Sequence, residues 1–222
     1  MSEKNSVSKE LKEKLFSKKK NGIFRMNDAE LKSCDEFSES YKSFLNAAKT
    51  EREADEQSVE LLKQKGFKEY TIGMKLSAGD KIYRINRGKA VIAAIIGSEP
   101  IESGVRLCAA HIDSPRLDLK QFPLYEDSEM ALFKTHYYGG IKKYQWTAIP
   151  LSLHGVIIKS DNSSVKVNIG EDENDPVFCV TDLLPHLATE QMKRNLAQGI
   201  KGEELNIVVG SRPFKDDEAS EA

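Results

Sequence analysis

The spacing of apolar residues predicts that the chain begins with helices. Residues 1–20 are polar and charged, and we expect them to form a charged helix that frays at its ends. From Asp28, the expected N-cap, to Lys49, apolar side chains recur at helical intervals. Thr50-Glu51-Arg52-Glu53 matches a capping box, and the helix that it opens is expected to stop at Gly66. Two well-defined helices therefore precede the first convincing strand.

The hydrophobic period changes after Gly66. Residues 81–86 alternate as in a strand, and Arg87-Gly88-Lys89 predicts a tight turn. Residues 90–97 and 104–110 are continuous apolar runs, which are typical of strands buried on both faces of a sheet. Strands of this kind with flanking helices predict an α/β layered domain. The second run leads directly into His111.

A β-rich pattern follows Pro115. Residues 116–120 alternate like a half-exposed strand, and one helix is expected over 182–196. Further strands are expected at 132–138, 147–160 and 163–169, separated by Gly, Asp and Asn turns. Residues 215–222 are acidic without periodicity, so we expect disorder there. The predicted division is an α/β part at 1–116, a β-rich part at 117–214 and a tail at 215–222.

Composition narrows the class of protein. The 222 residues are 39% hydrophobic and 31% charged, as in globular domains, and a net charge of −2 argues against a nucleic-acid partner. No stretch approaches the roughly 18 apolar residues of a membrane span, and the polar N-terminus lacks the apolar core of a secretory signal. Three widely spaced cysteines without a CxxC pair predict reduced thiols and argue against a cysteine-based zinc site. We expect a cytoplasmic protein that binds neither membrane nor nucleic acid.

His111-Ile112-Asp113 carries the first candidate chemistry. The ends of strands in α/β folds are where ligand-binding groups lie. A neutral imidazole is a good zinc ligand, and a carboxylate two residues later can hold its second ring nitrogen. In the alternative interpretation, His111 is an ordinary strand-end residue and Asp113 belongs to the turn before Pro115. The pattern alone leaves both open.

The other three histidines have plain structural interpretations beside functional ones. His136 lies among aromatic residues before Gly139-Gly140, which fits either a ligand pocket or an ordinary hairpin. His186 lies early in the expected helix, where the pattern favours a packed histidine over a functional one, and His154 is expected to be an exposed strand residue. The sequence contains no GxSxG, GxxxxGK[ST] or HExxH motif, which removes the common hydrolase, nucleotide-binding and helix-borne metalloprotease patterns.

Residues 109–117 (AAHIDSPRL) closely resemble the zinc-ligand segment of the M18 metallopeptidases, the aspartyl aminopeptidase family. Other segments resemble the same family in the expected order, so that the resemblance extends from about residue 20 to 215. These segments are TERE at 50–53, YYGG at 137–140 followed by Trp146 and LSL at 151–153, LLPHL at 183–187, and GEELN at 202–206.

The resemblance implies a fold and a role for three residues. It implies part of an α/β/α zinc-exopeptidase catalytic domain with an inserted β-rich dimerisation domain, in a large homo-oligomer. His111 matches the first zinc ligand, and Asp113 matches the residue that holds its imidazole. His186 matches a second family histidine, either a zinc ligand or a substrate contact in a neighbouring subunit, and we group it with the metal residues. The family uses two zinc ions to remove N-terminal residues from peptides, acidic ones in many members.

The chain departs from the family pattern in one respect. The bridging Asp, the Glu pair and the final His lie further C-terminal in M18 proteins, and nothing after Asp113 matches them. We therefore expect a truncated zinc aminopeptidase that is inactive alone. The alternatives are a non-catalytic oligomerisation or interaction fragment of such an enzyme, and a related two-metal exopeptidase of different specificity.

Overall fold

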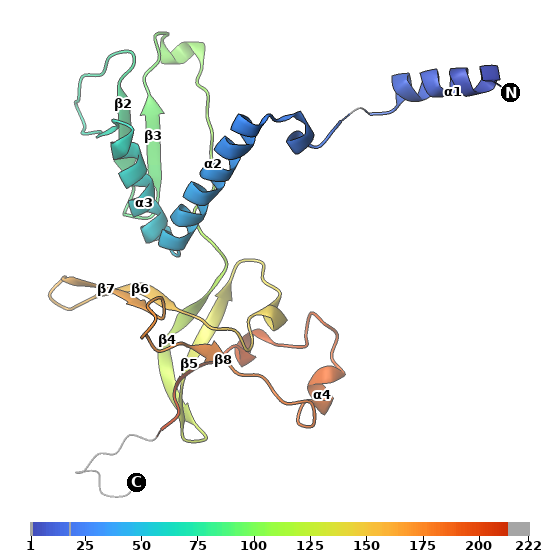
Figure 1. Ribbon diagram of the computed structural model, residues 1–222. Helices are drawn as coiled ribbons and strands as arrows, with labels where there is room; N and C mark the ends of the chain where they lie inside the picture. The colour runs from blue at the N-terminus through green and yellow to red at the C-terminus, as the bar shows by residue number, and fades with distance from the viewer. Residues whose placement is uncertain (1, 18, 213–222) are drawn as a thin grey trace, which may run out of the picture. The chain divides into compact units, whose positions relative to one another are not determined.

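The computed structural model describes residues 2–17 and 19–212, in two compact units, Met1–Ala47 and Ala48–Ala222. The first unit contains α1 (Ser2–Leu15), a 3-10 turn (Gly22–Arg25) and α2 (Asp28–Ala47), which confirms the predicted N-terminal helices (Figure 1). The cap of α2 is Asn27, one residue before the predicted Asp28. The Glu30 backbone N–H donates to Asn27 Oδ1 at 2.9 Å, and the Asn27 N–H donates to the Glu30 carboxylate at 2.8 Å. The tail predicted at 215–222 lies outside the described residues.

The second unit opens with α3 (Glu51–Gln64), which begins at the predicted capping box. Thr50 Oγ1 accepts the Glu53 backbone N–H at 3.3 Å, and the Glu53 carboxylate accepts the Thr50 N–H at 2.9 Å. These bonds satisfy N–H groups that have no partner inside the helix. Gly66, with a φ of 81°, follows the helix in the left-handed conformation expected at its end. None of the helices in the described ranges is long and apolar enough to cross a bilayer.

A three-stranded sheet follows, in the order β1-β2-β3 (Lys68–Glu69, Lys81–Ile85, Val91–Ile95). β2 and β3 form the predicted antiparallel hairpin, with Arg87 and Gly88 at positive φ in its turn. The expectation of two strands buried on both faces is wrong here. Ile92 on β3 is 73% exposed, because β3 is the edge of this sheet. Residues 104–110 form no strand, and Leu107 is 84% exposed, because no neighbouring strand pairs with them within the described part of the chain.

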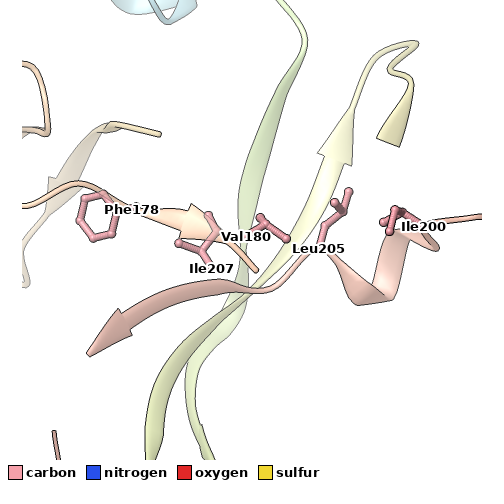
Figure 2. Packing of buried hydrophobic residues seen from close by; sticks show 5 residues of the cluster. All are labelled: Phe178, Val180, Ile200, Leu205 and Ile207. Carbon is pink, nitrogen blue, oxygen red and sulfur yellow. The ribbon is translucent and has the colours of Figure 1, made fainter. Parts of the chain in front are cut away.

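The remaining strands confirm the β-rich pattern after Pro115. A four-stranded sheet has the order β4-β5-β9-β8 (Arg116–Asp127, Met130–Tyr138, Ile207–Gly210, Cys179–Val180). β6 (Leu153–Ile158) and β7 (Ser164–Ile169) form a separate antiparallel hairpin. A core of five buried residues includes members of β8 and β9 (Figure 2): Phe178, Val180, Ile200, Leu205 and Ile207. The domain boundary predicted near residue 117 stays a prediction.

The helix predicted over 182–196 is wrong for most of its length. The structure contains only α4 (Thr189–Met192), preceded by irregular backbone and a turn. Pro185 has no N–H to donate to a helix, and Leu184 and Leu187 are 60% and 67% exposed. Short helices depend on packing of an apolar face, which these residues lack here.

Candidate functional site

The segment that carries the candidate ligands, residues 104–115, has irregular backbone. It ends where β4 begins, beside the last residue of β5, because Arg116 pairs with Tyr138 in the β4–β5 register. Gly139, with a φ of 80°, turns the chain away directly after Tyr138, and a Cβ atom there would lie 3.6 Å from Pro115. The start of β4 and the end of β5 thus position His111 and Asp113.

Asp113 binds the imidazole of His111, as the two-residue spacing predicts. His111 Nδ1 lies 3.0 Å from Asp113 Oδ1 and 2.9 Å from the Asp113 backbone oxygen. Both partners are acceptors, so in a neutral imidazole this geometry favours the proton on Nδ1 and the lone pair on Nε2. The His111 side chain is 82% exposed, which leaves Nε2 accessible. This is the arrangement of a metal-binding histidine with a carboxylate behind it.

Tyr138 holds the other oxygen of the same carboxylate. Its hydroxyl donates to Asp113 Oδ2 at 2.7 Å. This hydrogen bond is the largest cause of the lowered pKa of Asp113, and the His111 contact acts in the same direction. The same bond and the Asp113 charge raise the pKa of Tyr138. Asp113 is therefore a carboxylate at neutral pH, shared between an imidazole and a phenol.

Arg116 completes this group of side chains. Its guanidinium lies 4.0 Å from the centroid of the Tyr138 ring, within cation–π range. Its nitrogens bind Glu51 Oε1 at 2.9 Å and Asp118 Oδ1 at 2.7 Å. Burial alone would lower the pKa of Arg116, but these carboxylates raise it. The start of α3, which supplies Glu51, is thus connected to β4 and β5.

A groove of about 620 Å³ runs beside these residues. Its lining includes the charged or polar residues Arg116 and His154, and Trp146 and Phe178 are among its many apolar lining residues. A mostly apolar lining with a few polar groups is the usual character of a ligand-binding cleft.

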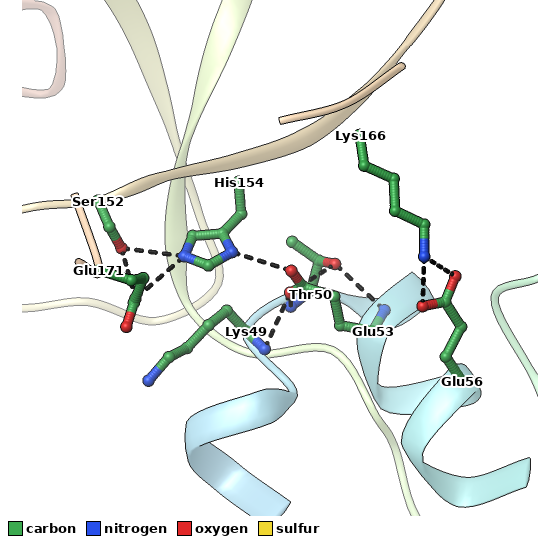
Figure 3. A network of polar contacts seen from close by, with 8 residues as sticks. All are labelled: Lys49, Thr50, Glu53, Glu56, Ser152, His154, Lys166 and Glu171. Atoms are coloured by element: carbon green, nitrogen blue, oxygen red, sulfur yellow. Dashed lines mark hydrogen bonds and ion pairs between the residues drawn. The ribbon is translucent and has the colours of Figure 1, made fainter. Parts of the chain in front are cut away.

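His154 corrects a prediction, because its side chain is only 9% exposed. Glu53 Oε1 lies 2.9 Å from Nδ1, while Glu171 Oε1 and Ser152 Oγ lie 3.0 Å and 3.1 Å from Nε2 (Figure 3). A protonated imidazole can donate to both carboxylates at once. Glu53, which closes the capping box with its other oxygen, thereby links α3 to β6.

Comparison with known proteins identifies a family. The family model described as aminopeptidase I zinc metalloprotease (M18) matches residues 44–221. The chain belongs to the M18 family. It is 47% identical over 208 residues to a probable M18 family aminopeptidase 1 of Clostridium acetobutylicum, covering 92% of this chain and 45% of that protein. A counterpart of Thermotoga maritima is 45% identical over 186 residues, covering 82% of this chain and 40% of that protein.

Solved M18 structures have the same fold. The Thermotoga maritima enzyme superimposes with a TM-score of 0.82 at 40% identity, covering 91% of this chain and 44% of that one. Aminopeptidase I of Borrelia burgdorferi superimposes with a TM-score of 0.77 at 40% identity, covering 90% of this chain and 45% of that one. The predicted α/β fold class is confirmed, while the inserted domain stays a prediction. The chain spans less than half the length of the relatives that it matches.

At this site the described residues offer one zinc-type donor, His111, with a carboxylate behind it. His111 offers Nε2 with Nδ1 already bound, which suits zinc. In residues 2–17 and 19–212 there is no group of three or more His, Cys, Asp or Glu side chains close enough to hold a metal ion. His186 lies exposed in a turn before α4 and shares no recorded contact with His111. The metal roles of His111 and His186 and the role of Asp113 therefore stay predictions.

Sequence reasoning missed Tyr138, Arg116 and His154 as parts of polar networks. Tyr138 and Arg116 belong to recognised M18 segments, but their contact depends on the strand register. For His154 a partial signal was present, because the capping-box Glu53 uses only one oxygen on the helix and leaves the other free. His136 is an exposed β5 residue stacked on Tyr137 at 5.5 Å, in agreement with the hairpin interpretation.

Proposed function

We propose that this chain contributes the first metal ligand to the active site of a zinc aminopeptidase. The observation that carries the proposal is the contact of 3.0 Å between Asp113 Oδ1 and His111 Nδ1, which leaves Nε2 free to bind a metal. The family match supports the zinc chemistry. The substrates would be peptides, which lose an N-terminal residue, acidic by analogy with many family members.

Each of the two residues has a defined task in this proposal. When bound, zinc supplies a Lewis acid that polarises the scissile carbonyl and lowers the pKa of water. His111 binds through Nε2, and Asp113 accepts the Nδ1 proton, which fixes the ring orientation and increases the basicity of Nε2. Two zinc ions per complete site would require ligands beyond His111. His186 would join them, or would contact substrate in a neighbouring subunit.

The isolated 222-residue chain is expected to be inactive, since the described residues include no cluster of three metal donors. Zinc content and hydrolysis of N-terminal aminoacyl substrates by the purified chain test this directly. We expect fewer than two bound zinc ions and no hydrolysis. Two tightly bound zinc ions with turnover would contradict the proposed incompleteness.

A chimera tests the enzyme function itself. This chain would replace the matching portion of the Clostridium acetobutylicum relative, of which it covers 45% at 47% identity. If the chain retains a working ligand set, the chimera should hydrolyse peptides in a zinc-dependent manner, with the parent relative as the positive control. A folded chimera without activity, beside an active parent, would contradict the proposal.

A second candidate function is non-catalytic oligomerisation. Exposed apolar side chains in the β-rich part favour it, since Phe122 is 90% exposed and Leu187 is 67% exposed. In either function we propose assembly into a homo-oligomer through this part, in the cytoplasm. If the chimera assembles but does not hydrolyse peptides, the oligomerisation function gains support. Sedimentation of the chain and the chimera measures whether each assembles into an oligomer.

A further inference from the structure

The segment that bears His111 and Asp113 requires an anchor outside itself. Residues 104–115 make no strand pairing in the described structure, and His111 is 82% exposed. The Asp113 side chain is 34% exposed, and a partly exposed carboxylate on irregular backbone has several accessible rotamers. The single rotamer that directs Oδ1 toward His111 needs another contact to fix it.

Tyr138 supplies this contact from a strand. It is the last residue of β5, and its hydroxyl donates to Asp113 Oδ2 at 2.7 Å. The two oxygens of Asp113 are thereby divided, with Oδ2 bound to the phenol and Oδ1 facing His111 Nδ1. With one oxygen fixed, rotation of the carboxylate away from the imidazole would break a hydrogen bond to a charged group, which is stronger than a neutral one.

Arg116 holds the tyrosine ring in turn. The two residues are directly paired across β4 and β5, so their side chains are cross-strand neighbours. The guanidinium lies 4.0 Å from the ring centroid and is itself fixed by Glu51 and Asp118. It also donates to the Ser114 backbone oxygen at 3.3 Å, next to Asp113. The ring and the irregular segment are thus attached to the same cation.

We propose that Tyr138 is a positioning residue for the metal ligand: it orients Asp113, and Arg116 with Glu51 keeps its ring in place. The proposal deepens the function proposed above and rests on it for the identity of the metal. The contacts within this chain also predict the tautomer of His111, which can be tested without the metal. Nδ1 should carry the proton, and Nε2 should be the unprotonated nitrogen.

¹⁵N NMR of the histidine-labelled chain, in metal-free solution at a pH where the imidazoles are neutral, measures this tautomer. Free histidine favours the Nε2–H form, so a dominant Nδ1–H form at His111 is the expected result in the unaltered chain. His111→Gln assigns the resonance among the four histidines. Tyr138→Phe should lower the ratio of Nδ1–H to Nε2–H by about threefold or more, the effect of losing an ordinary hydrogen bond. The backbone oxygen of Asp113 also faces Nδ1, so the preference should decrease without vanishing.

Tyr125→Phe is the matched control. Tyr125 lies on β4 of the same hairpin, also under a cation, and no hydrogen bond of its hydroxyl is recorded in the described structure. It should leave the tautomer ratio of His111 unchanged. An unchanged ratio in Tyr138→Phe, or an equal change in both variants, would overturn the proposal. A dominant Nε2–H form at His111 in the unaltered chain would also overturn the proposal, whether or not Tyr138→Phe folds.

This experiment separates the further inference from the proposed function. A weaker tautomer preference in Tyr138→Phe together with an inactive chimera would support the positioning role and contradict the proposed enzyme function. An active chimera with no effect of Tyr138→Phe on the tautomer would support the proposed enzyme function and contradict the positioning role.

Discussion

Glu53 and His154 are 101 positions apart in the chain, yet Glu53 Oε1 and His154 Nδ1 are 2.9 Å apart. The same glutamate caps α3 through its other oxygen. Lys166 and Glu56, 2.7 Å apart, form a second, more exposed connection between β7 and α3 (Figure 3). One glutamate therefore both caps the start of α3 and connects that helix to the β6–β7 hairpin.

His154→Ala should destabilise the chain by about 1–3 kcal/mol. The substitution leaves two carboxylates, Glu53 and Glu171, facing each other without their shared donor. The free energy of unfolding in urea measures the effect. His136→Ala is the control, because that exposed side chain lies outside this network, and it should change stability by no more than about 0.5 kcal/mol. Equal effects of the two substitutions would contradict a stabilising role for the His154 network.

The same network predicts a loss of stability in acid. Hydrogen bonds from Ser152 and His154 lower the pKa of Glu171 below its ordinary 4.5. Burial raises the pKa of Glu53, but contacts with His154 and Thr50 outweigh it, so that the pKa of Glu53 is also lowered. The unfolded chain therefore binds more protons near pH 4.5, and this stabilisation is present above that value and lost as pH falls through the folded pKa values.

Urea unfolding between about pH 6 and about pH 3 measures this dependence. The combined substitution Glu53→Gln and Glu171→Gln should make the decline below about pH 4.5 shallower than in the unaltered chain. Glu10→Gln combined with Glu13→Gln, at two exposed positions of α1, is the control. A decline of equal steepness in all three proteins would show that other carboxylates cause it.

Thr50→Ala should remove the hydroxyl half of the capping box and cost about 1 kcal/mol of stability. Thr50 Oγ1 is the acceptor for the Glu53 N–H, which would otherwise lack a partner within the helix. Thr50→Ser keeps the acceptor and should retain most of the stability. The urea midpoint compares the three proteins, and an equal loss in Ser and Ala would point to the methyl group instead of the cap.

Asp113→Asn, made in the chimera, should weaken zinc binding by about 10- to 100-fold, as loss of a carboxylate behind a metal-bound histidine does. The amide keeps the shape but cannot serve both His111 and Tyr138 as a charged acceptor. Competition with a zinc chelator measures the affinity. Asp127→Asn, at the far end of the β4–β5 hairpin, is the control and should bind zinc like the unaltered chimera.

Local signals in the sequence predicted much of this fold. The capping box at Thr50, the end of α3 at Gly66 and the β2–β3 hairpin all depend on neighbouring residues, and all are confirmed. The apolar run at 104–110 did not form a strand, because pairing requires a partner strand that local sequence cannot supply. The helix expected around His186 failed for a related reason, since its leucines have no packing surface here.

The candidate site was predictable where it is local. His111 and Asp113 are two residues apart, and their contact follows from spacing. Tyr138 reaches Asp113 across 25 positions and His154 reaches Glu53 across 101, so both contacts depend on strand register and on packing between elements. Such contacts become visible only when the fold is known.

Peptide hydrolysis by the chimera with His111→Ala tests the central claim most directly, with His136→Ala as the matched histidine control. If His111 is a metal ligand, the His111→Ala chimera should lose bound zinc and all but background hydrolysis, since one of few ligands is removed. His136→Ala should retain both. A folded His111→Ala chimera that binds zinc and hydrolyses peptide at the unaltered rate would contradict the assignment of His111.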